Sequence, residues 1–330
     1  MGDTRVDRNA IRDIVQLACR APSLFNSQPW RWIAENNALQ LFLDKDRVLP
    51  STDHSGREAL IGCGAALDHL RVASAAQGWR VNVDRLPNPN NPQHLASIGF
   101  RPAELVTEGH RRRAETILQR HTDRLPFVAP PDWDSVEAQL HRSVTSAAVR
   151  LDVIADELRP ELANASRLTA SLRLYDTSYH SELSWWTGPF ESVEGVPHNT
   201  LVSASEADRV QVGRDFPRIQ HGDRRPGYRH DESKILVLST HDNDRTSVLE
   251  CGEMLSAVLL EATMEGLATC PLTHITELWA SRDIVSRLIG QSTTPQVLVR
   301  VGLAPAHEDP PPPTLRRPID EVLKIREQNR

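Results

Sequence analysis

The chain has 330 residues, of which 39% are hydrophobic and 25% charged, a composition typical of a globular protein with two domains or one large fused unit. Its 38 basic and 44 acidic residues give a net charge of −6, which argues against nucleic-acid binding through bulk charge. No apolar run reaches the roughly 18–20 residues that span a bilayer, and the N-terminus has no apolar signal segment. The four cysteines form no C-x-x-C pair, so we expect a cytoplasmic protein without membrane contact, disulfide framework or zinc knuckle.

The predicted elements begin with an amphipathic helix at 8–20 and a hairpin at 30–42 that turns at Asn36-Asn37. The later elements are strands at 80–84 and 98–101, a helix at 133–143, a strand at 149–155, helices near 161–175, and strands at 235–239 and 296–302. Residues 87–92 are predicted to form a loop. Residues 191–230 have little periodicity, and since a loop that long is usually functional or disordered, we regard them as a candidate lid. The tail at 310–313 is a polyproline spacer.

Two helical segments, 63–79 and 251–267, resemble each other position by position, with Cys63 matching Cys251 and Gly78 matching Gly266. Both begin with Cys-Gly, have a leucine four positions later and close with a glycine that fits a helix C-cap. The similarity arises either from chance between two amphipathic helices or from an internal duplication.

Several familiar catalytic motifs either do not occur or lack the surrounding elements that they require. Gly62-Cys63-Gly64 with Asp84 imitates a dinucleotide fingerprint, but no strand is predicted before it and the third glycine is missing. No Gly-x-Ser-x-Gly and no Walker loop occurs, and the 13 histidines form no zinc-like set.

Two short segments are better candidates for a ligand site. Residues 21–30, APSLFNSQPW, gather small polar side chains that offer several hydrogen-bond donors and acceptors to one ligand; alternatively, the loop caps helix ends and anchors Trp30 in the core. Residues 119–124 place Arg120 and Arg124 four apart with Thr122 between them, which suits a phosphate and a second anionic group, or a solvated helix end. Arg316-Arg317 has the same ambiguity, but together these segments supply enough cations for one phosphate.

The same segments resemble the FMN-dependent nitroreductase family. APSLFNSQPW is similar to the family's A-P-S-x-x-N-x-Q-P-W motif, and residues 120–124 resemble its R-[RH]-[ST]-x-[RK] flavin motif. The helix at 249–266 with residues 268–272 resembles the family stretch whose backbone lies beside the flavin ring, and Arg316-Arg317 lies where the family has a C-terminal phosphate-binding pair. In overall arrangement the chain resembles the Acg-type NAD(P)H nitroreductases of mycobacteria.

The resemblance implies an α+β, nitroreductase-like fold of two tandem half-units, each with a mixed or antiparallel sheet flanked by helices. We expect a first half at 1–112, which supplies APSLFNSQPW, and a second at 113–330, which supplies the phosphate side. The first half has no flavin motif at 1–9, and the second has no NSQPW segment after 133–143. A fused pseudo-dimer of this kind would keep one complete site for one FMN, either as a monomer or in a further homodimer.

By motif position, the resemblance assigns roles to individual residues. Arg120, Arg316 and Arg317 would hold the phosphate, His121 and Thr122 the phosphate or ribityl chain, and Arg124 the negative charge that reduction places near N1 and O2. The first half would contribute Pro22, Ser23, Asn26 and Gln28, and the stretch beside flavin N5 would be Pro271, Leu272 and Thr273.

The implied activity is ping-pong transfer of hydride from NAD(P)H through FMN to a small acceptor, a nitroaromatic or a quinone, with no side chain needed as acid or base. The alternative is a flavin-sequestering or stress-related FMN-binding protein, in which residues 191–230 cover the flavin and prevent NAD(P)H turnover. The sequence does not choose between NADH and NADPH or name the acceptor.

Overall fold

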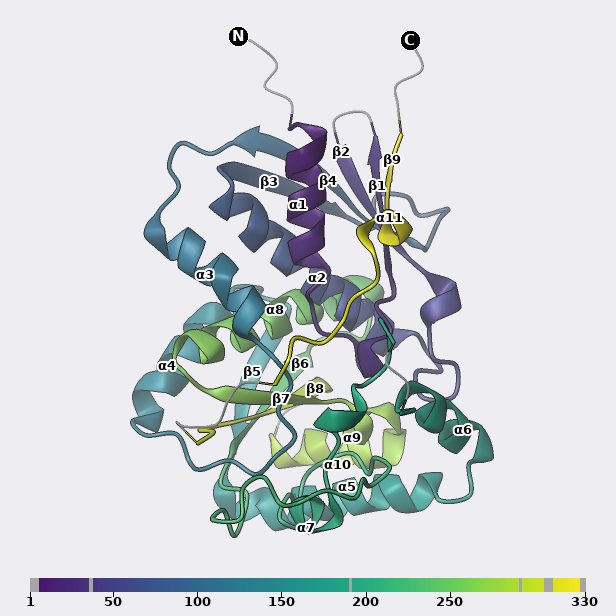
Figure 1. The fold of residues 1–330 in the computed structure, drawn as a ribbon, viewed down its shortest axis with the longest axis vertical. Helices are drawn as coiled ribbons and strands as arrows, with labels where there is room; N and C mark the ends of the chain where they lie inside the picture. Colours follow the sequence, from purple (N-terminus) through teal and green to yellow (C-terminus); the bar gives the residue numbers. More distant parts are fainter. Residues whose placement is uncertain (1–5, 36–37, 190–191, 291–292, 306–310, 327–330) are drawn as a thin grey trace.

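The computed structural model describes residues 6–35, 38–189, 192–290, 293–305 and 311–326, arranged as two sheets with a pair of long helices between them (Figure 1). The upper part comprises α1 (Arg8–Ala18), η1 (Leu24–Asn26), β1 (Trp30–Glu35), β2 (Ala38–Leu43), η2 (Lys45–Arg47), α2 (Arg57–Ala76), β3 (Trp79–Arg85), β4 (His94–Pro102) and α3 (Glu108–Gln119). Its five-stranded sheet has the order β3-β4-β2-β1-β9 and is antiparallel except for the parallel pair β1–β9. Trp30 and Trp32 of β1 are fully buried in the core of this part.

The lower part continues the chain through α4 (Trp133–Ser143), β5 (Val149–Ile154), η3 (Asp156–Leu158), α5 (Arg159–Arg173), α6 (Thr177–Trp186), η4 (His198–Thr200), α7 (Ala204–Asp208), β6 (Lys234–Thr240), α8 (Arg245–Met264), β7 (Ala268–Leu272), α9 (His274–Glu277), α10 (Trp279–Leu288) and β8 (Thr294–Gly302). Its four-stranded antiparallel sheet has the order β5-β6-β8-β7. The C-terminal segment, yellow in Figure 1, then returns to the upper part through α11 (Ile319–Val322) and β9 (Leu323–Ile325).

The two sheets repeat one topology. The order β3-β4-β2-β1 matches β7-β8-β6-β5, and in both parts a long helix, α2 or α8, connects the second strand of the repeat to the third. The α+β fold of two half-units, with one mixed and one antiparallel sheet, is therefore confirmed. A boundary at 112/113 stays a proposal, and β9 crosses it by joining the first sheet.

Helices α2 and α8 cross where the sequence repeats. A Cβ on Gly64 would lie 2.0 Å from the Leu249 carbonyl oxygen, and a Cβ on Gly252 would lie 2.1 Å from the Ile61 carbonyl oxygen. The alignment that matches Cys63 with Cys251 makes Gly64 equivalent to Gly252 and Ile61 equivalent to Leu249. Reciprocal contacts of this kind are those of a two-fold interface, so the structure supports duplication over chance.

The half-units differ most in one connection. Strands β1 and β2 are joined by residues 36–37, whereas the whole stretch 155–233 stands between β5 and β6. This insertion carries α5, α6 and α7, and the candidate lid at 191–230 belongs to it. The predicted turn at Asn36-Asn37, Glu191 and Pro310 lie outside the described residues. No helix in the described part of the chain is long and apolar enough to cross a membrane.

Most predicted elements occur with shifted ends. The strands predicted at 80–84 and 98–101 are parts of β3 and β4, which run longer because the two strands pair along the whole of Trp79–Arg85. The predicted helix at 8–20 ends at Ala18. Helices α3, α6, α7, α9, α10 and α11 were not predicted, because most of them are short and α3 is strongly charged, which leaves little apolar periodicity.

Candidate functional site

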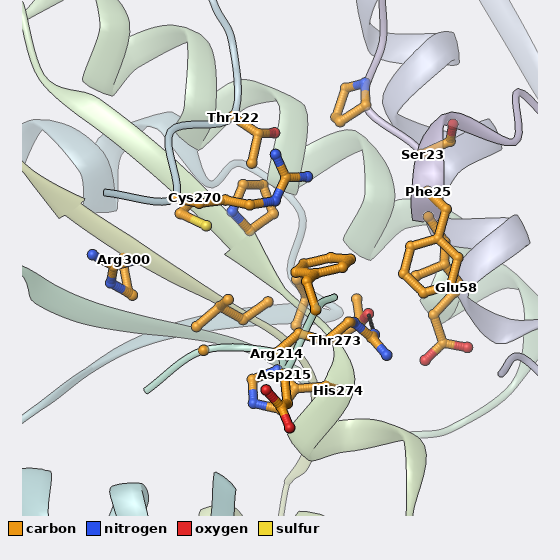
Figure 2. Close-up of a pocket in the computed structure, with 18 of the residues that line it drawn as sticks. Ser23, Phe25, Glu58, Thr122, Arg214, Asp215, Cys270, Thr273, His274 and Arg300 are labelled. Carbon is orange, nitrogen blue, oxygen red and sulfur yellow. Dashed lines mark hydrogen bonds between the residues drawn. The ribbon is translucent and has the colours of Figure 1, made fainter. Parts of the chain in front are cut away.

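A cavity of about 250 Å³ lies between the half-units. The first half lines it with Pro22, Ser23, Phe25 and the start of α2, and the second half with Thr122, Arg124 and the residues at the end of β7. Figure 2 shows Ser23, Phe25 and Glu58 on one side of the cavity and Thr122 and Cys270 on the other. The structure thus brings the predicted residues Pro22, Ser23, Thr122, Arg124, Pro271, Leu272 and Thr273 to one cavity.

The APSLFNSQPW loop is held in a tight, partly left-handed conformation. Phe25, Asn26 and Gln28 have φ angles of 49°, 57° and 52°, and the Gln28 amide donates to Ser23 Oγ at 3.0 Å. The Gln28 side chain is fully buried, accepts the Arg317 amide at 2.9 Å and donates to the Val193 carbonyl at 2.8 Å. Gln28 therefore ties the loop to the C-terminal segment and the insertion, and it lines neither the cavity nor the pocket beside it.

This adjoining pocket contains a cluster of cations. It shares Pro22, Ser23, Phe25, Thr122 and Arg124 with the cavity and adds Asn26, Arg120, His121 and Arg316. Arg120 is 7% exposed, and its Nε and Nη1 have no hydrogen-bond partner among the described residues. Arg316 donates to the carbonyls of Cys19 and Arg20, and Arg20 donates to the Thr314 carbonyl.

No carboxylate in the described part of the chain pairs with Arg20, Arg120 or Arg316. Burial and, to a smaller extent, repulsion from Arg20 together lower the pKa of Arg120 to about 10 and that of Arg316 to about 9. Arg120 is buried and Arg20 and Arg316 are half-buried. Cations that are shielded from water and have no counter-ion are costly, so this arrangement fits an anionic ligand that completes the cluster.

Arg317 differs from its neighbour. Its Nη1 lies 3.6 Å from Asp44 Oδ2 and its Nε lies 3.4 Å from Glu321 Oε2. The structure places Arg317 among carboxylates and outside both pockets, whereas Arg20, which the motif comparison missed, joins the cluster. The only sequence signal for Arg20 is its position directly before the APS motif.

Arg124 stands where the cavity and the cation pocket meet. Burial lowers its pKa, and in the described part of the chain it pairs with no carboxylate. The Asp123 amide donates to the Thr269 carbonyl at 2.9 Å, and Arg225 donates to Asp123 at 2.6 Å. These bonds fix the 122–124 segment beside β7, so that Thr122 and Arg124 point into the site.

The insertion covers the cavity on one side, and we call its residues 202–218 the roof. Residues from Val202 to Arg218 contribute to the lining of the cavity, and the Arg214 guanidinium lies 4.9 Å from the centroid of the Phe25 ring. The Phe216 ring packs edge-on against Phe25 at 5.9 Å and under the Arg124 guanidinium at 5.1 Å. Arg214 also forms an ion pair with Glu277 and donates to Thr273 Oγ1 at 3.1 Å. Both half-units therefore hold the roof in place.

Comparison with known proteins gives the family. No family model matches the sequence. The chain is 69% identical to "Putative NAD(P)H nitroreductase acg" of Mycobacterium tuberculosis over 99% of this chain and 98% of that protein. It belongs to the Acg-type nitroreductases. A second M. tuberculosis protein with the name "putative NAD(P)H nitroreductase" is 37% identical over 98% of this chain and 93% of its own length. The solved structure of a "putative nitroreductase" from Anabaena variabilis shares the fold, with a TM-score of 0.53, 8% identity and coverage of 92% of this chain and 90% of that one.

In this nitroreductase the two equivalent helices α2 and α8 carry different side chains at the cavity. Under the alignment of the two helices, Gly62, which lines the cavity, corresponds to Glu250, and Ala65 corresponds to Glu253. Glu253 is fully buried and pairs with Arg71 and Arg85, and Glu250 accepts a hydrogen bond from Ser146. The α8 position equivalent to the cavity residue Gly62 thus carries a glutamate side chain, which agrees with one site per chain.

Proposed function

We propose that the chain binds one FMN across the two half-units and passes hydride from NAD(P)H to a small acceptor, a nitroaromatic or a quinone. The observation that carries the proposal is the cluster of Arg20, Arg120 and Arg316, which pairs with no carboxylate of the described residues and lies beside a largely apolar cavity. A phosphate at the cluster and a flat ring in the cavity match these two environments. Bound FMN would supply the hydride chemistry, which no side chain of this protein provides.

The surrounding residues have defined tasks in this proposal. Arg120, Arg20 and Arg316 bind the phosphate, and Asn26, His121 and Thr122 stand close enough to the pocket to bind the phosphate or ribityl chain. Arg124 provides a half-buried cation for the negative charge of the reduced ring. Pro22, Ser23 and the end of β7 (Pro271, Leu272, Thr273) shape the walls around the ring.

The absorption spectrum of the purified protein, with and without NADPH, tests this proposal. We expect one flavin per chain, which bleaches under anaerobic NADPH and recovers its colour on addition of a quinone. A protein that binds no flavin would contradict the binding site. A flavin that dithionite reduces but NADPH does not would contradict the NAD(P)H-dependent activity.

The roof over the cavity favours a second candidate, an FMN-binding protein that sequesters flavin without NAD(P)H turnover. Phe216 and Arg214 lie against Phe25 and would cover the open face of a ring in the cavity. A nicotinamide has to stack on that face to transfer hydride. The same bleaching experiment separates the two functions, since only the enzyme reacts with NADPH.

A further inference from the structure

Glu58 is a buried acid in the wall of the cavity. It stands in the first turn of α2, is 4% exposed and lies beside Phe25 in Figure 2. A buried carboxyl is costly unless it is hydrogen-bonded, paired or protonated. Glu58 has no role in the FMN binding proposed above.

The neighbours of Glu58 satisfy only one of its oxygens. Arg57 Nη2 donates to Glu58 Oε1, and no donor reaches Oε2 within the described part of the chain. Arg57 is also satisfied by neutral oxygens, since its Nη1 donates to the Gln296 carbonyl at 2.6 Å and its Nη2 to the Thr276 carbonyl at 3.0 Å. The arginine therefore does not depend on an ionised Glu58.

The charges around Glu58 act in both directions. The pKa of Glu58 is raised to about 8, chiefly by burial; the nearby Asp53 carboxyl adds to the rise and Arg57 opposes it. Arg282 of α10 interacts with the Arg57–Glu58 pair, and Arg214 faces the cavity from the insertion. Burial and the Asp53 carboxyl therefore favour the protonated form of Glu58, against the opposing charge of its ion-pair partner Arg57.

The duplicated half-unit gives an independent comparison. The position on α8 that is equivalent to Glu58 holds Thr246. The acid thus occurs on α2, which lines the cavity with Glu58, Ile61 and Gly62, and is absent from the equivalent position of α8.

We propose that Glu58 is the proton donor to the electron acceptor. This inference rests on the proposed function. Reduction of a quinone needs one hydride, which the cofactor supplies, and one proton. The O–H bond of the Glu58 carboxyl breaks as a new O–H bond forms on the quinone oxygen, and the electron pair of the broken bond stays on the carboxylate. Arg57 stabilises that carboxylate until solvent returns a proton.

Infrared spectroscopy of the protein tests the protonation state without any turnover. We expect a protonated-carboxyl C=O band at pH 7 that disappears in Glu58→Gln and fades in the wild type above pH 8. The control Glu182→Gln changes a carboxyl outside the cavity, which accepts the backbone amides of Ser51 and Thr52, and should leave this band in place. A wild-type spectrum without the band at pH 7 would overturn the proposal.

The acceptor half-reaction tests the transfer itself. The flavoprotein is reduced with dithionite and mixed with benzoquinone, so the result does not depend on reaction with NAD(P)H. We expect wild-type reoxidation to slow above pH 8, and Glu58→Gln to be at least about tenfold slower below pH 8 with a flat pH profile. Glu58→Asp should recover part of the rate, and Glu182→Gln should match the wild type. Equal rates and pH profiles for Glu58→Gln and the wild type would overturn the role of Glu58 alone, whereas a wild type that retains no flavin would overturn the proposed function together with it.

Discussion

Gly64 and Gly252 lie against each other at the crossing of α2 and α8, where each lets the backbone of the other helix approach. A Cβ on Gly64 would meet the Gly252 Cα at 2.9 Å as well as the Leu249 carbonyl oxygen at 2.0 Å. The same two helices are joined by a second contact, in which Ser256 donates to Asp68 at 2.6 Å. Asp68 and Ser256 are equivalent to each other in the repeat, as Gly64 and Gly252 are. The cavity spans the half-units, so its shape depends on this crossing.

Gly64→Ala should therefore destabilise the protein by about 3 kcal/mol or more, because the added methyl group meets backbone atoms that cannot rotate away. Urea unfolding followed by tryptophan fluorescence measures the change. Gly99→Ala is the control: a Cβ at Gly99 meets nothing within 4 Å, and we expect a change within about 0.5 kcal/mol. Equal stability of the Gly64 and Gly99 variants would contradict the close crossing.

Arg120→Ala should weaken FMN binding at least about tenfold, because a charge-assisted hydrogen bond to phosphate contributes roughly 1.5–3 kcal/mol. The same change should raise the melting temperature of the apoprotein, since it removes a buried cation that repels Arg20 and Arg316. Flavin titration and thermal unfolding measure the two effects. The control is Arg111→Ala, an exposed arginine of α3. Full flavin retention by Arg120→Ala would mean that the phosphate lies elsewhere.

The sequence predicts the half-units well because their signals are local. The repeat at 63–79 and 251–267, the hairpin pattern and the APSLFNSQPW motif each lie in one short stretch. The cation cluster was predicted only in part. Arg20 and Arg317 look alike in the sequence, and only tertiary structure sets Arg20 beside Arg120 and gives Arg317 the carboxylates Asp44 and Glu321.

No pattern in the sequence identifies Glu58 or the roof residues as parts of the site. A glutamate in the first turn of a helix usually interacts with the helix dipole in solvent, and only the packing of the two half-units buries this one. Arg214 and Phe216 stand in a stretch without periodicity, so their contacts with Phe25 depend on how the long insertion at 155–233 folds back.

Phe216→Ala should loosen the roof. The change removes an aromatic pair with Phe25 and a cation–π contact with Arg124, together about 1–3 kcal/mol, which raises the open population roughly 5- to 150-fold. We expect faster bleaching of the flavin by NADPH in stopped-flow measurements. Arg229→Ala is the control, because Arg229 is exposed in the same insertion and lines no part of the cavity. If both variants bleach at the wild-type rate, the roof does not limit access of NADPH.

Acid should loosen the insertion through Glu206, a fully buried residue of α7. Burial alone would raise its pKa, but hydrogen bonds from Arg224 and from the Ser203 amide outweigh burial and lower the pKa to about 2, against an ordinary value of 4.5. Because the pKa is lower in the folded protein, the ionised form stabilises the fold above pH 4.5. This contribution, about 3 kcal/mol, is lost as the pH falls from 4.5 towards 2.

Pepsin digestion between pH 5 and pH 3 measures the effect. We expect cleavage within residues 192–230 of the wild type to accelerate as the pH falls. Glu206→Gln should already be cleaved quickly at pH 5, since it lacks the charge that Arg224 pairs with. Glu232→Gln, which changes an exposed carboxyl, corrects for the pH dependence of pepsin itself and should follow the wild type. If Glu206→Gln also follows the wild type, Glu206 does not hold the insertion, and the Arg214 and Phe216 contacts alone keep the roof closed.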